Sequence, residues 1–400
     1  MRPRKSETEM RILLLHTRYI EQGGEDVVFD NELRLLQSMG ESVSPLVFDN
    51  NLLSRMHSGL VAINTIYNAT SYKRVLQEIR EYHPNIMHVH NTFPLASPSV
   101  ILAAHRARLP VVLTLHNYRL LCPNALLYRD NVICEDCLGK LPYPAVIHSC
   151  YRSSKAATAV VAGMLMLHRF FGTWDKGIQY FIALTEHSRK KFVEGGLPAE
   201  KVLVKPNFLY PDPGIGEPMA GKFALFVGRL SPEKGIDVLL EAWSKQKMTN
   251  TLLIIGTGPL NRKVAKASDE NPSIRWLGRK PREDVVSFMK QASFLVLPSV
   301  VYENFPMTIV EAFATGLPVV ASDLGAMASL VDHGRTGLRF RPGDASDLAE
   351  KVEWLLSHPR ELDKMRKEAR HEYEVKYTAE RNYQLLMGIY ERALEAAKKA

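Results

Sequence analysis

The chain has no apolar run long enough to cross a lipid bilayer. Its longest strongly hydrophobic stretch, residues 158–167, stops at His168 and Arg169, well short of the ~20 residues that a membrane helix needs. The first ten residues, MRPRKSETEM, are polar and lack the apolar core of a secretory signal. We therefore expect a cytoplasmic protein, with peripheral contact at the inner face of the plasma membrane left open, and residues 1–10 as a disordered lead-in.

Basic residues are in slight excess but do not gather in blocks. The formal net charge of +8 suits phosphorylated substrates, anionic lipid or nucleic acid, and also an ordinary solvated surface. No long run of Lys and Arg and no RNA-binding signature occurs. We therefore expect no nucleic-acid partner.

Cysteine is scarce and confined to one segment. The four cysteines are Cys122, Cys134, Cys137 and Cys150. In a cytosolic enzyme such a group suggests a metal before a disulfide, and tetrahedral zinc accepts four thiolates. Because only one CxxC pair is present, three interpretations stay open: a structural zinc, unliganded thiols, or disulfides.

The remaining pattern is an alternation of short β-rich runs with amphipathic helical runs, which is typical of parallel sheets covered by helices. A chain of 400 residues exceeds what one core usually supports. We therefore predict an α/β protein of two Rossmann-like, doubly wound domains facing each other across a cleft. Strands are expected at 12–15, 43–48, 86–90, 111–115, 178–184 and 202–205 in the first half, and at 223–227, 251–255, 274–277, 294–297 and 318–321 in the second.

Composition also predicts the domain boundaries. Residues 11–207 form the predicted first domain, with a Cys-rich insert at 117–152. Three prolines and three glycines between 207 and 222 mark a linker at 208–222. Residues 223–378 form the second domain, and a helix at 379–400 is expected to cross back to the first.

The segment GRLSPEKG, residues 228–235, follows a predicted strand and opens a helix. A helix N-terminus offers unpaired amide groups and a positive dipole end, which suit a phosphate. Arg229 can bind two phosphate oxygens at once, Lys234 adds a mobile charge, and Gly228 allows close approach. The alternative is a surface turn with an arginine in a salt bridge.

The segment VYENFPMTIVEAFATG, residues 301–316, contains two carboxylates, Glu303 and Glu311. Proline favours the first helical turn, so a helix should begin at Pro306, with Glu303 in the loop before it and Glu311 inside it. A carboxylate accepts two hydroxyl hydrogen bonds, so Glu311 suits a ribose and Glu303 a sugar; helix capping and surface exposure are the alternatives. The expected donor-binding group at the helix start comprises Asn304, Phe305, Pro306 and Met307.

Two neighbouring turns carry weaker signals. The sequence IIGTGPLN, residues 254–261, lacks the third glycine of the dinucleotide fingerprint, so we interpret it as a tight strand-to-helix turn. Arg279 follows the strand at 274–277, where a nucleotide base could rest against the backbone. This position does not indicate which base would bind.

Together, GRLSPEKG, the two spaced glutamates and the GTGP turn resemble the retaining glycosyltransferases of family 4, which have the GT-B fold. The resemblance extends over nearly the whole chain and is most specific in its C-terminal half. It implies that Arg229 and Lys234 bind the donor diphosphate, Glu311 the ribose and Glu303 the transferred sugar. It also implies a metal-independent reaction, and bacterial transferases of cell-surface polysaccharides are the nearest subgroup.

The first domain has its own candidates at predicted strand ends. Gly23 and Gly24 join a strand to a helix, and the resemblance implies that this loop lies near the donor phosphate. His116 follows the strand at 111–115, and position together with resemblance points to a catalytic contact with the donor sugar. His90 and Asn91 are weaker acceptor-side candidates, and a plain packing role is the alternative for each.

We therefore expect a hexosyltransferase that moves a sugar from a UDP-, GDP- or ADP-sugar to a hydroxyl of a glycan or lipid-linked glycan. No cofactor is required for this catalysis. The helix expected at 154–171 either lies on a membrane surface or packs under the sheet. The alternatives are a sugar-nucleotide epimerase or hydrolase of the same fold, and a non-catalytic glycan- or nucleotide-binding protein.

Overall fold

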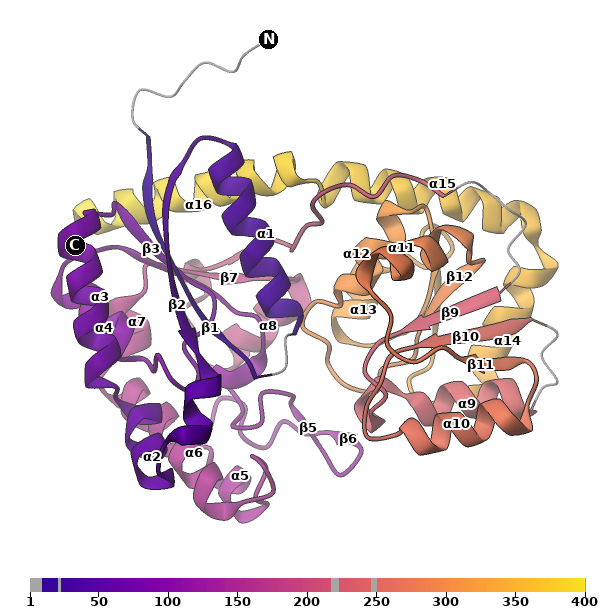
Figure 1. Cartoon of the computed structure of the whole chain (residues 1–400), viewed down its shortest axis with the longest axis horizontal. Coiled ribbons are helices and arrows are strands. Elements are labelled where there is room, and N and C mark those ends of the chain that lie inside the picture. Colours follow the sequence, from indigo (N-terminus) through magenta and orange to yellow (C-terminus); the bar gives the residue numbers. More distant parts are fainter. Residues whose placement is uncertain (1–8, 21–22, 217–222, 246–249, 400) are drawn as a thin grey trace, which may run out of the picture. The chain divides into compact units, whose positions relative to one another are not determined.

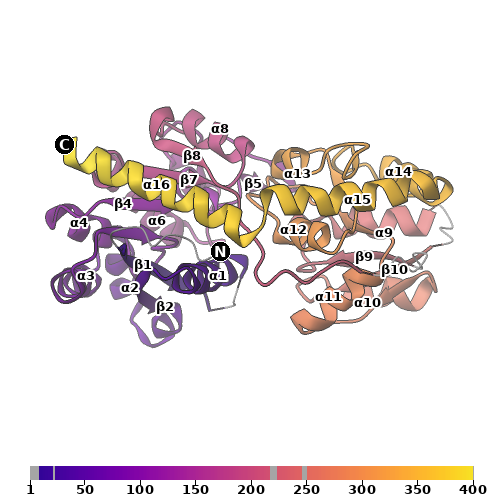
Figure 2. The ribbon, with the colours of Figure 1, turned by 90° about the horizontal axis from the view of Figure 1, so that it is seen from above.

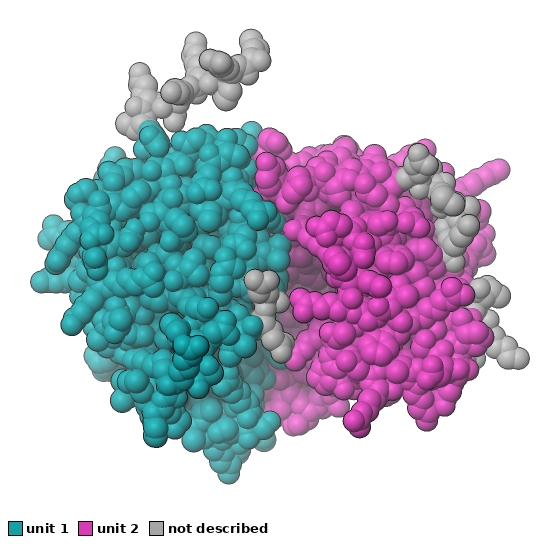
Figure 3. All heavy atoms as spheres, in the orientation of Figure 1, with its two compact units in different colours: residues 1–126, 135–206, 382–400 teal, residues 127–134, 207–381 magenta. Residues whose placement is uncertain are grey.

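The computed structural model describes residues 9–20, 23–216, 223–245 and 250–399. Most of the predicted lead-in, residues 1–8, and the end of the predicted linker, residues 217–222, lie outside the described residues. The chain forms two compact units, coloured separately in Figure 3. Unit 1 comprises residues 1–126, 135–206 and 382–400, and unit 2 comprises residues 127–134 and 207–381.

Unit 1 is built on a parallel six-stranded sheet in the order β2-β1-β3-β4-β7-β8. Four of its strands, β1, β2, β3 and β7, are labelled in Figure 1. Its strands are β1 (Arg11–Arg18), β2 (Ser42–Asp49), β3 (Ile86–Val89), β4 (Val111–Thr114), β7 (Tyr180–Ala183) and β8 (Val202–Val204). Every residue of β3 and β4 is buried, as expected for a parallel sheet with helices on both faces.

The helices of unit 1 follow the alternation that the sequence predicts. They are α1 (Gly24–Ser38), α2 (Ser58–Ile66), α3 (Ala69–Tyr82), α4 (Ser99–Arg106), α5 (Tyr143–Ile147), α6 (Lys155–Phe170), α7 (Thr173–Gly177) and α8 (Glu186–Glu194), with 3-10 turns η1 (Asn50–Arg55), η2 (Tyr118–Leu120) and η3 (Ala199–Lys201). Side chains cap several of them: Asn68 accepts hydrogen bonds from Thr70 and Ser71 at the start of α3.

The last helix, α16 (Ala379–Lys399), contributes its residues from 382 onward to unit 1 (Figure 2). Tyr390 of this helix is buried, and its hydroxyl lies 2.8 Å from His88 Nδ1 on β3. Asn382 donates to the carbonyl of Pro206 at 2.8 Å. The C-terminal helix is therefore bonded to the sheet of the N-terminal sequence.

Unit 2 has a second parallel six-stranded sheet, in the order β11-β10-β9-β12-β13-β14. Its strands are β9 (Phe223–Val227), β10 (Thr251–Ile255), β11 (Ile274–Trp276), β12 (Phe294–Leu297), β13 (Val319–Ser322) and β14 (Gly337–Phe340). The helical elements are η4 (Pro232–Lys234), α9 (Ile236–Lys245), α10 (Asn261–Glu270), α11 (Arg282–Gln291), α12 (Met307–Ala314), α13 (Gly325–Leu330), α14 (Ala345–Ser357) and α15 (Pro359–Lys376). A two-stranded hairpin, β5 (Tyr128–Arg129) and β6 (Val132–Ile133), is grouped with this unit.

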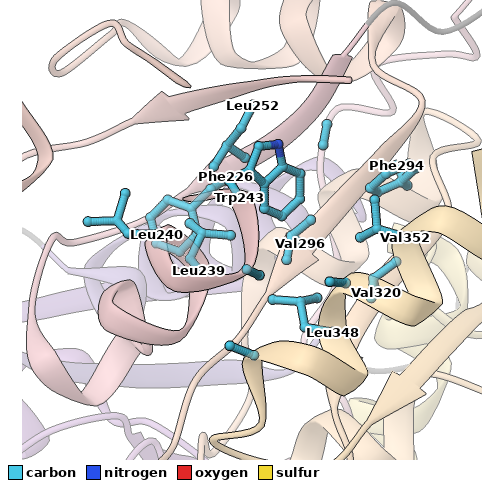
Figure 4. Close-up of a cluster of buried hydrophobic side chains, with 14 of the residues drawn as sticks. Phe226, Leu239, Leu240, Trp243, Leu252, Phe294, Val296, Val320, Leu348 and Val352 are labelled. Atoms are coloured by element: carbon cyan, nitrogen blue, oxygen red, sulfur yellow. The ribbon is translucent and has the colours of Figure 1, made fainter. Parts of the chain in front are cut away.

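The core of unit 2 packs one face of the sheet against α9 and α14 (Figure 4). Trp243 of α9 is fully buried and donates its indole N–H to the carbonyl of Asn250 at 3.1 Å. Leu348 and Val352 of α14 are fully buried in the same cluster. Apolar residues at helical spacing thus hold both helices against alternating strand residues.

The predicted fold class, two parallel-sheet α/β domains, is confirmed. Strands β9, β10 and β12 have the predicted bounds, and α12 begins after Pro306 as predicted. Strand β14 and the β5–β6 hairpin were not predicted from the sequence. No helix among the described residues combines the length and apolar character of a membrane span.

Replacing Trp243 with Ala should lower the free energy of unfolding by about 3–5 kcal/mol, because it leaves a cavity in the core and an unpaired carbonyl at Asn250. The matched control is Trp354→Ala, since Trp354 is 38% exposed and stacks on His358. Urea denaturation of the full chain measures both variants. Equal losses would contradict this description of the core.

Candidate functional site

The candidate site of unit 2 lies where the direction of strand addition reverses. Strand β9 lies between β10 and β12, so the connections after β9 and β12 leave in opposite directions. In open α/β sheets such a switch point, outside the carboxyl ends of the strands, is the usual place for a ligand. The segments 228–235 and 298–306 follow these two strands.

Close backbone contacts join the loops at this edge of the sheet. Gly228 N donates to Ile255 O at 3.0 Å, and Leu230 N donates to Thr257 O at 3.1 Å. Gly256 has a φ of +140°, and a Cβ on it would lie 1.9 Å from Gly228 O. The GTG turn therefore needs glycine for close packing against the GRLSPEKG loop.

A second contact of this kind joins the GRLSPEKG loop to the end of β12. Gly235 has a φ of +69°, and a Cβ there would lie 1.9 Å from Pro298 O. Val300 N donates to Glu233 O at 3.0 Å. These contacts hold η4 and the start of α9 beside the loop that leads into α12.

Lys234 and Glu303 meet where these two loops come together. Lys234 Nζ lies 2.5 Å from Glu303 Oε1, and Ser299 Oγ donates to the same oxygen at 2.7 Å. The side chains are 26% and 14% exposed, respectively. The pair is therefore partly shielded from water but still open to a ligand.

Glu311 lies inside α12, the helix that follows the loop containing Glu303. Its Oε1 is 3.7 Å from an Arg282 guanidinium nitrogen at the start of α11. Burial raises the pKa of Glu311 above its usual value, and Arg282 opposes that shift only in part. Glu311 is thus a poorly hydrated carboxyl group that a hydroxyl could satisfy by hydrogen bonding.

The other donor-site candidates of unit 2 differ in exposure. Arg229 is exposed, and its guanidinium makes no hydrogen bond or ion pair to any other residue that the structure describes. Arg279, after β11, is also exposed. Asn304 and Phe305 are buried, and Met307 is the first residue of α12. The two arginines are thus the exposed members of this group.

In unit 1 the carboxyl ends of β3 and β4 bring two predicted residues together. His90 Nδ1 lies 2.9 Å from His116 Nε2. Asn91, the third candidate at these ends, instead holds the backbone, because its amide donates to Thr17 O at 2.9 Å and its Oδ1 accepts from Phe93 N. The structure therefore gives Asn91 a structural role in the end of β3.

The GGED loop also has a well-defined capping structure. Gly23 is the N-cap of α1, and its amide donates to Asp26 Oδ2 at 2.8 Å. His16 lies 2.9 Å from the other oxygen of Asp26. Gly24 is the first residue of α1 and is exposed. Burial raises the pKa of the next residue, Glu25, to about 7.

A structural zinc on the four cysteines stays a prediction. All four cysteines are thiols, and Cys122 Sγ lies 3.0 Å from Asn124 Oδ1. Within the described residues, the one group of three potential metal ligands whose atoms lie within 4.8 Å of one another is Glu32, His88 and His90. No three of the four cysteine sulfur atoms, all of which belong to described residues, lie within this distance of one another.

Two family models match the chain. Residues 213–372 match the model described as glycosyl transferases group 1, and residues 57–207 match a glycosyl transferase 4-like domain. The two matches follow one another along the chain and together cover about three quarters of it. The chain belongs to the glycosyltransferases.

Relatives of this glycosyltransferase include a D-rhamnosyltransferase and a protein named for amylovoran biosynthesis. It is 27% identical over 270 residues to the D-rhamnosyltransferase WbpZ of Pseudomonas aeruginosa, covering 64% of each chain. It is 28% identical over 220 residues to the amylovoran biosynthesis glycosyltransferase AmsK of Erwinia amylovora, covering 50% of this chain and 53% of AmsK. The chain thus spans about half to two thirds of these curated relatives.

Solved structures share its fold. The Anabaena protein HepE in complex with UDP has a TM-score of 0.67 and 19% identity, with coverage of 96% of this chain and 100% of HepE. At this identity the likeness establishes the fold alone. The structural neighbours are GT-B glycosyltransferases, so the expected GT-B class is confirmed.

Two buried residues that lie beside His90 in unit 1, Glu32 and His88, were not predicted from the sequence. Glu32 is fully buried on α1, one helical turn beyond the buried Phe29. A glutamate on the apolar face of a helix was the available signal. His88 and His90 alternate along one strand and therefore share a face of the sheet.

Replacing Gly235 with Ala should push the two loops apart, because the new Cβ meets Pro298 O. Backbone strain alone lowers the free energy of unfolding by about 1–2 kcal/mol, and we expect the loss in Gly235→Ala to be larger than that. Gly343→Ala is the matched control, with a φ of +78° and no heavy atom within 4 Å of the added carbon. Denaturation midpoints compare the two variants. A loss no larger in Gly235→Ala would show that the close approach is unimportant.

Proposed function

We propose that the protein transfers a hexosyl residue from a nucleotide-diphosphate sugar to a hydroxyl of a glycan or lipid-linked glycan in cell-surface polysaccharide synthesis. The observation that carries this proposal is the pairing of Lys234 with Glu303 at the switch point of unit 2. It places a cation and a carboxylate, the two groups that a sugar diphosphate requires, side by side. The UDP bound to HepE and the names of WbpZ and AmsK support the proposal.

In this proposal the donor rearranges the pair. The diphosphate draws the Lys234 ammonium away from Glu303, and Arg229 adds a second cation. Glu303 is then able to accept hydrogen bonds from sugar hydroxyls. Glu311 takes the ribose hydroxyls, which relieves its poor hydration.

The reaction is proposed to proceed with retention and without a metal. The acceptor oxygen bonds to the anomeric carbon as the bond to the leaving phosphate breaks, on the same face of the sugar. The acceptor's hydroxyl proton passes to the departing phosphate oxygen. The developing negative charge is stabilised by Lys234, Arg229 and the unpaired amides at the starts of α9 and α12, and His116 of unit 1 contributes to sugar transfer.

A donor screen tests the reaction itself. The full chain is incubated with UDP-, GDP- and ADP-sugars in chelator, with and without lipid-linked glycan acceptors. Nucleoside diphosphate release that requires the acceptor, with the anomeric configuration of the product retained by NMR, is the expected result. Release without acceptor would indicate a hydrolase, donor conversion without release an epimerase, and binding without turnover a non-catalytic protein.

Replacing Lys234 with Ala should lower kcat/KM by about 100-fold or more, because a preorganised positive group no longer stabilises the leaving diphosphate. Lys263→Ala is the matched control, since Lys263 is 54% exposed and pairs with Asp237, which is 59% exposed, in the same unit. It should change kcat/KM by less than about twofold. Similar losses in both variants would remove Lys234 from the mechanism.

We further propose that an exposed apolar face of unit 1 contacts anionic lipid, which would bring a lipid-linked acceptor to the enzyme. Helix α6 buries Met164 and Leu165, as a core helix does, but Phe170 and the following Phe171 are 83% and 66% exposed. A cavity of about 220 Å³ beside them has a mainly apolar lining with two cationic members. It is lined by Leu120, Leu121, Lys140, Leu141, Pro142, Leu165, Met166, Arg169 and Phe170.

This combination of apolar and cationic groups suits a membrane surface with negative charge. Replacing both Phe170 and Phe171 with Ser should reduce binding to vesicles containing phosphatidylglycerol by about tenfold or more, because two aromatic side chains no longer enter the lipid. Val375→Ser, a change at a 51% exposed apolar residue of α15, is the control. Vesicle sedimentation measures all three proteins, and unchanged binding of the double variant would contradict the proposal.

A further inference from the structure

A chain of hydrogen bonds in unit 1 joins a buried ion pair to His116. Lys205 Nζ lies 3.0 Å from Glu32 Oε2, and Glu32 Oε1 lies 3.0 Å from His90 Nε2. His90 Nδ1 then lies 2.9 Å from His116 Nε2. The four side chains come from four different segments of the sequence and form one continuous path.

Burial divides this path into an inner and an outer part. Glu32, Lys205 and His90 are 0%, 1% and 2% exposed, respectively. His116 is partly exposed. The inner groups therefore exchange hydrogen bonds mainly with one another, whereas His116 can also meet a ligand.

The charges along the path decide the direction of each hydrogen bond. Burial opposes ionisation of Glu32, but Lys205, His88 and His90 outweigh burial and hold the pKa of Glu32 well below its usual value. Burial also lowers the pKa of His90 to about 4 and that of His116 well below its usual value. At neutral pH the path therefore contains one carboxylate and two neutral imidazoles beside Lys205.

A carboxylate only accepts hydrogen bonds, and a neutral imidazole has one N–H and one lone pair. His90 must therefore donate from Nε2 to Glu32, which leaves its Nδ1 as an acceptor. His116 must in turn donate from Nε2 to His90, which leaves its own Nδ1 without a proton. The buried carboxylate of Glu32 thus determines the tautomer of His116 through the intervening ring of His90.

His88 lies beside the path, and its Nδ1 is hydrogen-bonded to the Tyr390 hydroxyl at 2.8 Å. The same nitrogen lies 2.9 Å from Glu32 Oε1, and His88 Nε2 lies 2.8 Å from Thr114 Oγ1. Glu32, His88 and His90 also have the spacing of a metal site. Here the Lys205 ammonium already supplies the positive charge that a metal ion would bring to Glu32.

We infer that Glu32, Lys205 and His90 are positioning residues that hold His116 as the tautomer protonated at Nε2. His116 Nδ1 then carries the lone pair with which the ring accepts a hydrogen bond from a sugar hydroxyl. The tautomer itself follows from the geometry of unit 1. Its use in transfer rests on the proposed function.

NMR of the full chain with ¹⁵N-labelled histidine tests the tautomer directly. The His116 signals are assigned by their absence in His116→Gln. The expected result at pH 7 is a protonated Nε2 and an unprotonated Nδ1 in His116. A proton on Nδ1, or rapid exchange between both tautomers, in the unmodified protein would overturn the inference.

His90→Phe removes the acceptor for His116 Nε2 while keeping a ring of similar size. We expect the His116 nitrogens to shift toward mixed tautomers and kcat to fall by about 10–100-fold, with a smaller change in KM for the donor. His168→Phe is the control, because His168 is also buried and hydrogen-bonded in unit 1, to Thr173 and Ile66, but lies outside the path. It should leave the His116 signals in place.

These results separate the inference from the proposed function. A locked tautomer together with full activity of His116→Gln would keep the inference on the tautomer and reject the role of His116 in transfer. Unchanged His116 signals in a folded His90→Phe protein would reject the path itself. An effect of His168→Phe equal to that of His90→Phe would also reject it, because the loss would then be structural.

Discussion

The contact between the loops after β9 and β12 is the constraint that shapes the candidate donor site. Two neighbouring parallel strands send their connections in opposite directions, which leaves their carboxyl ends uncovered. Gly235 lets one loop approach Pro298 of the other, and the Lys234–Glu303 pair forms at the join. The Glu303 carboxylate thus compensates the charge of Lys234. Under the proposed function, phosphate binding would therefore exchange one anionic partner of Lys234 for another.

Unit 1 uses a buried ion pair in a different way. Glu32 and Lys205 are 173 positions apart in sequence, yet they lie 3.0 Å from each other beneath the ends of the sheet. Such a pair gives little net stability, because desolvation of both charges offsets their attraction. In this protein the pair instead determines which ring nitrogens of the neighbouring histidines donate hydrogen bonds and which accept them. The ion pairs of the two units therefore differ: the Lys234–Glu303 pair of unit 2 is open to a ligand, whereas the Glu32–Lys205 pair of unit 1 is buried.

Local signals made much of this fold predictable. Apolar runs gave β9, β10 and β12 their predicted bounds, and Pro306 correctly marked the start of α12. Strand β14 was missed because Gly337–Phe340 is short and contains an arginine and a glycine. Glu32 and His88 were missed because their partners lie far along the chain, and a propensity or a period carries no information on long-range pairing. The state of the four cysteines stayed open for the same reason, since spacing along a loop does not determine the distance between thiols.

The proposed function requires that the loops of unit 2 hold the diphosphate of a nucleotide sugar. Hydrogen–deuterium exchange of the full chain, with and without saturating UDP, GDP or ADP, measures this binding at the loops themselves. We expect the nucleoside diphosphate of the true donor to slow exchange at the backbone amides of 228–236 and 300–309, which begin α9 and α12. Binding that protects other segments and leaves these amides unchanged would refute the proposed donor site.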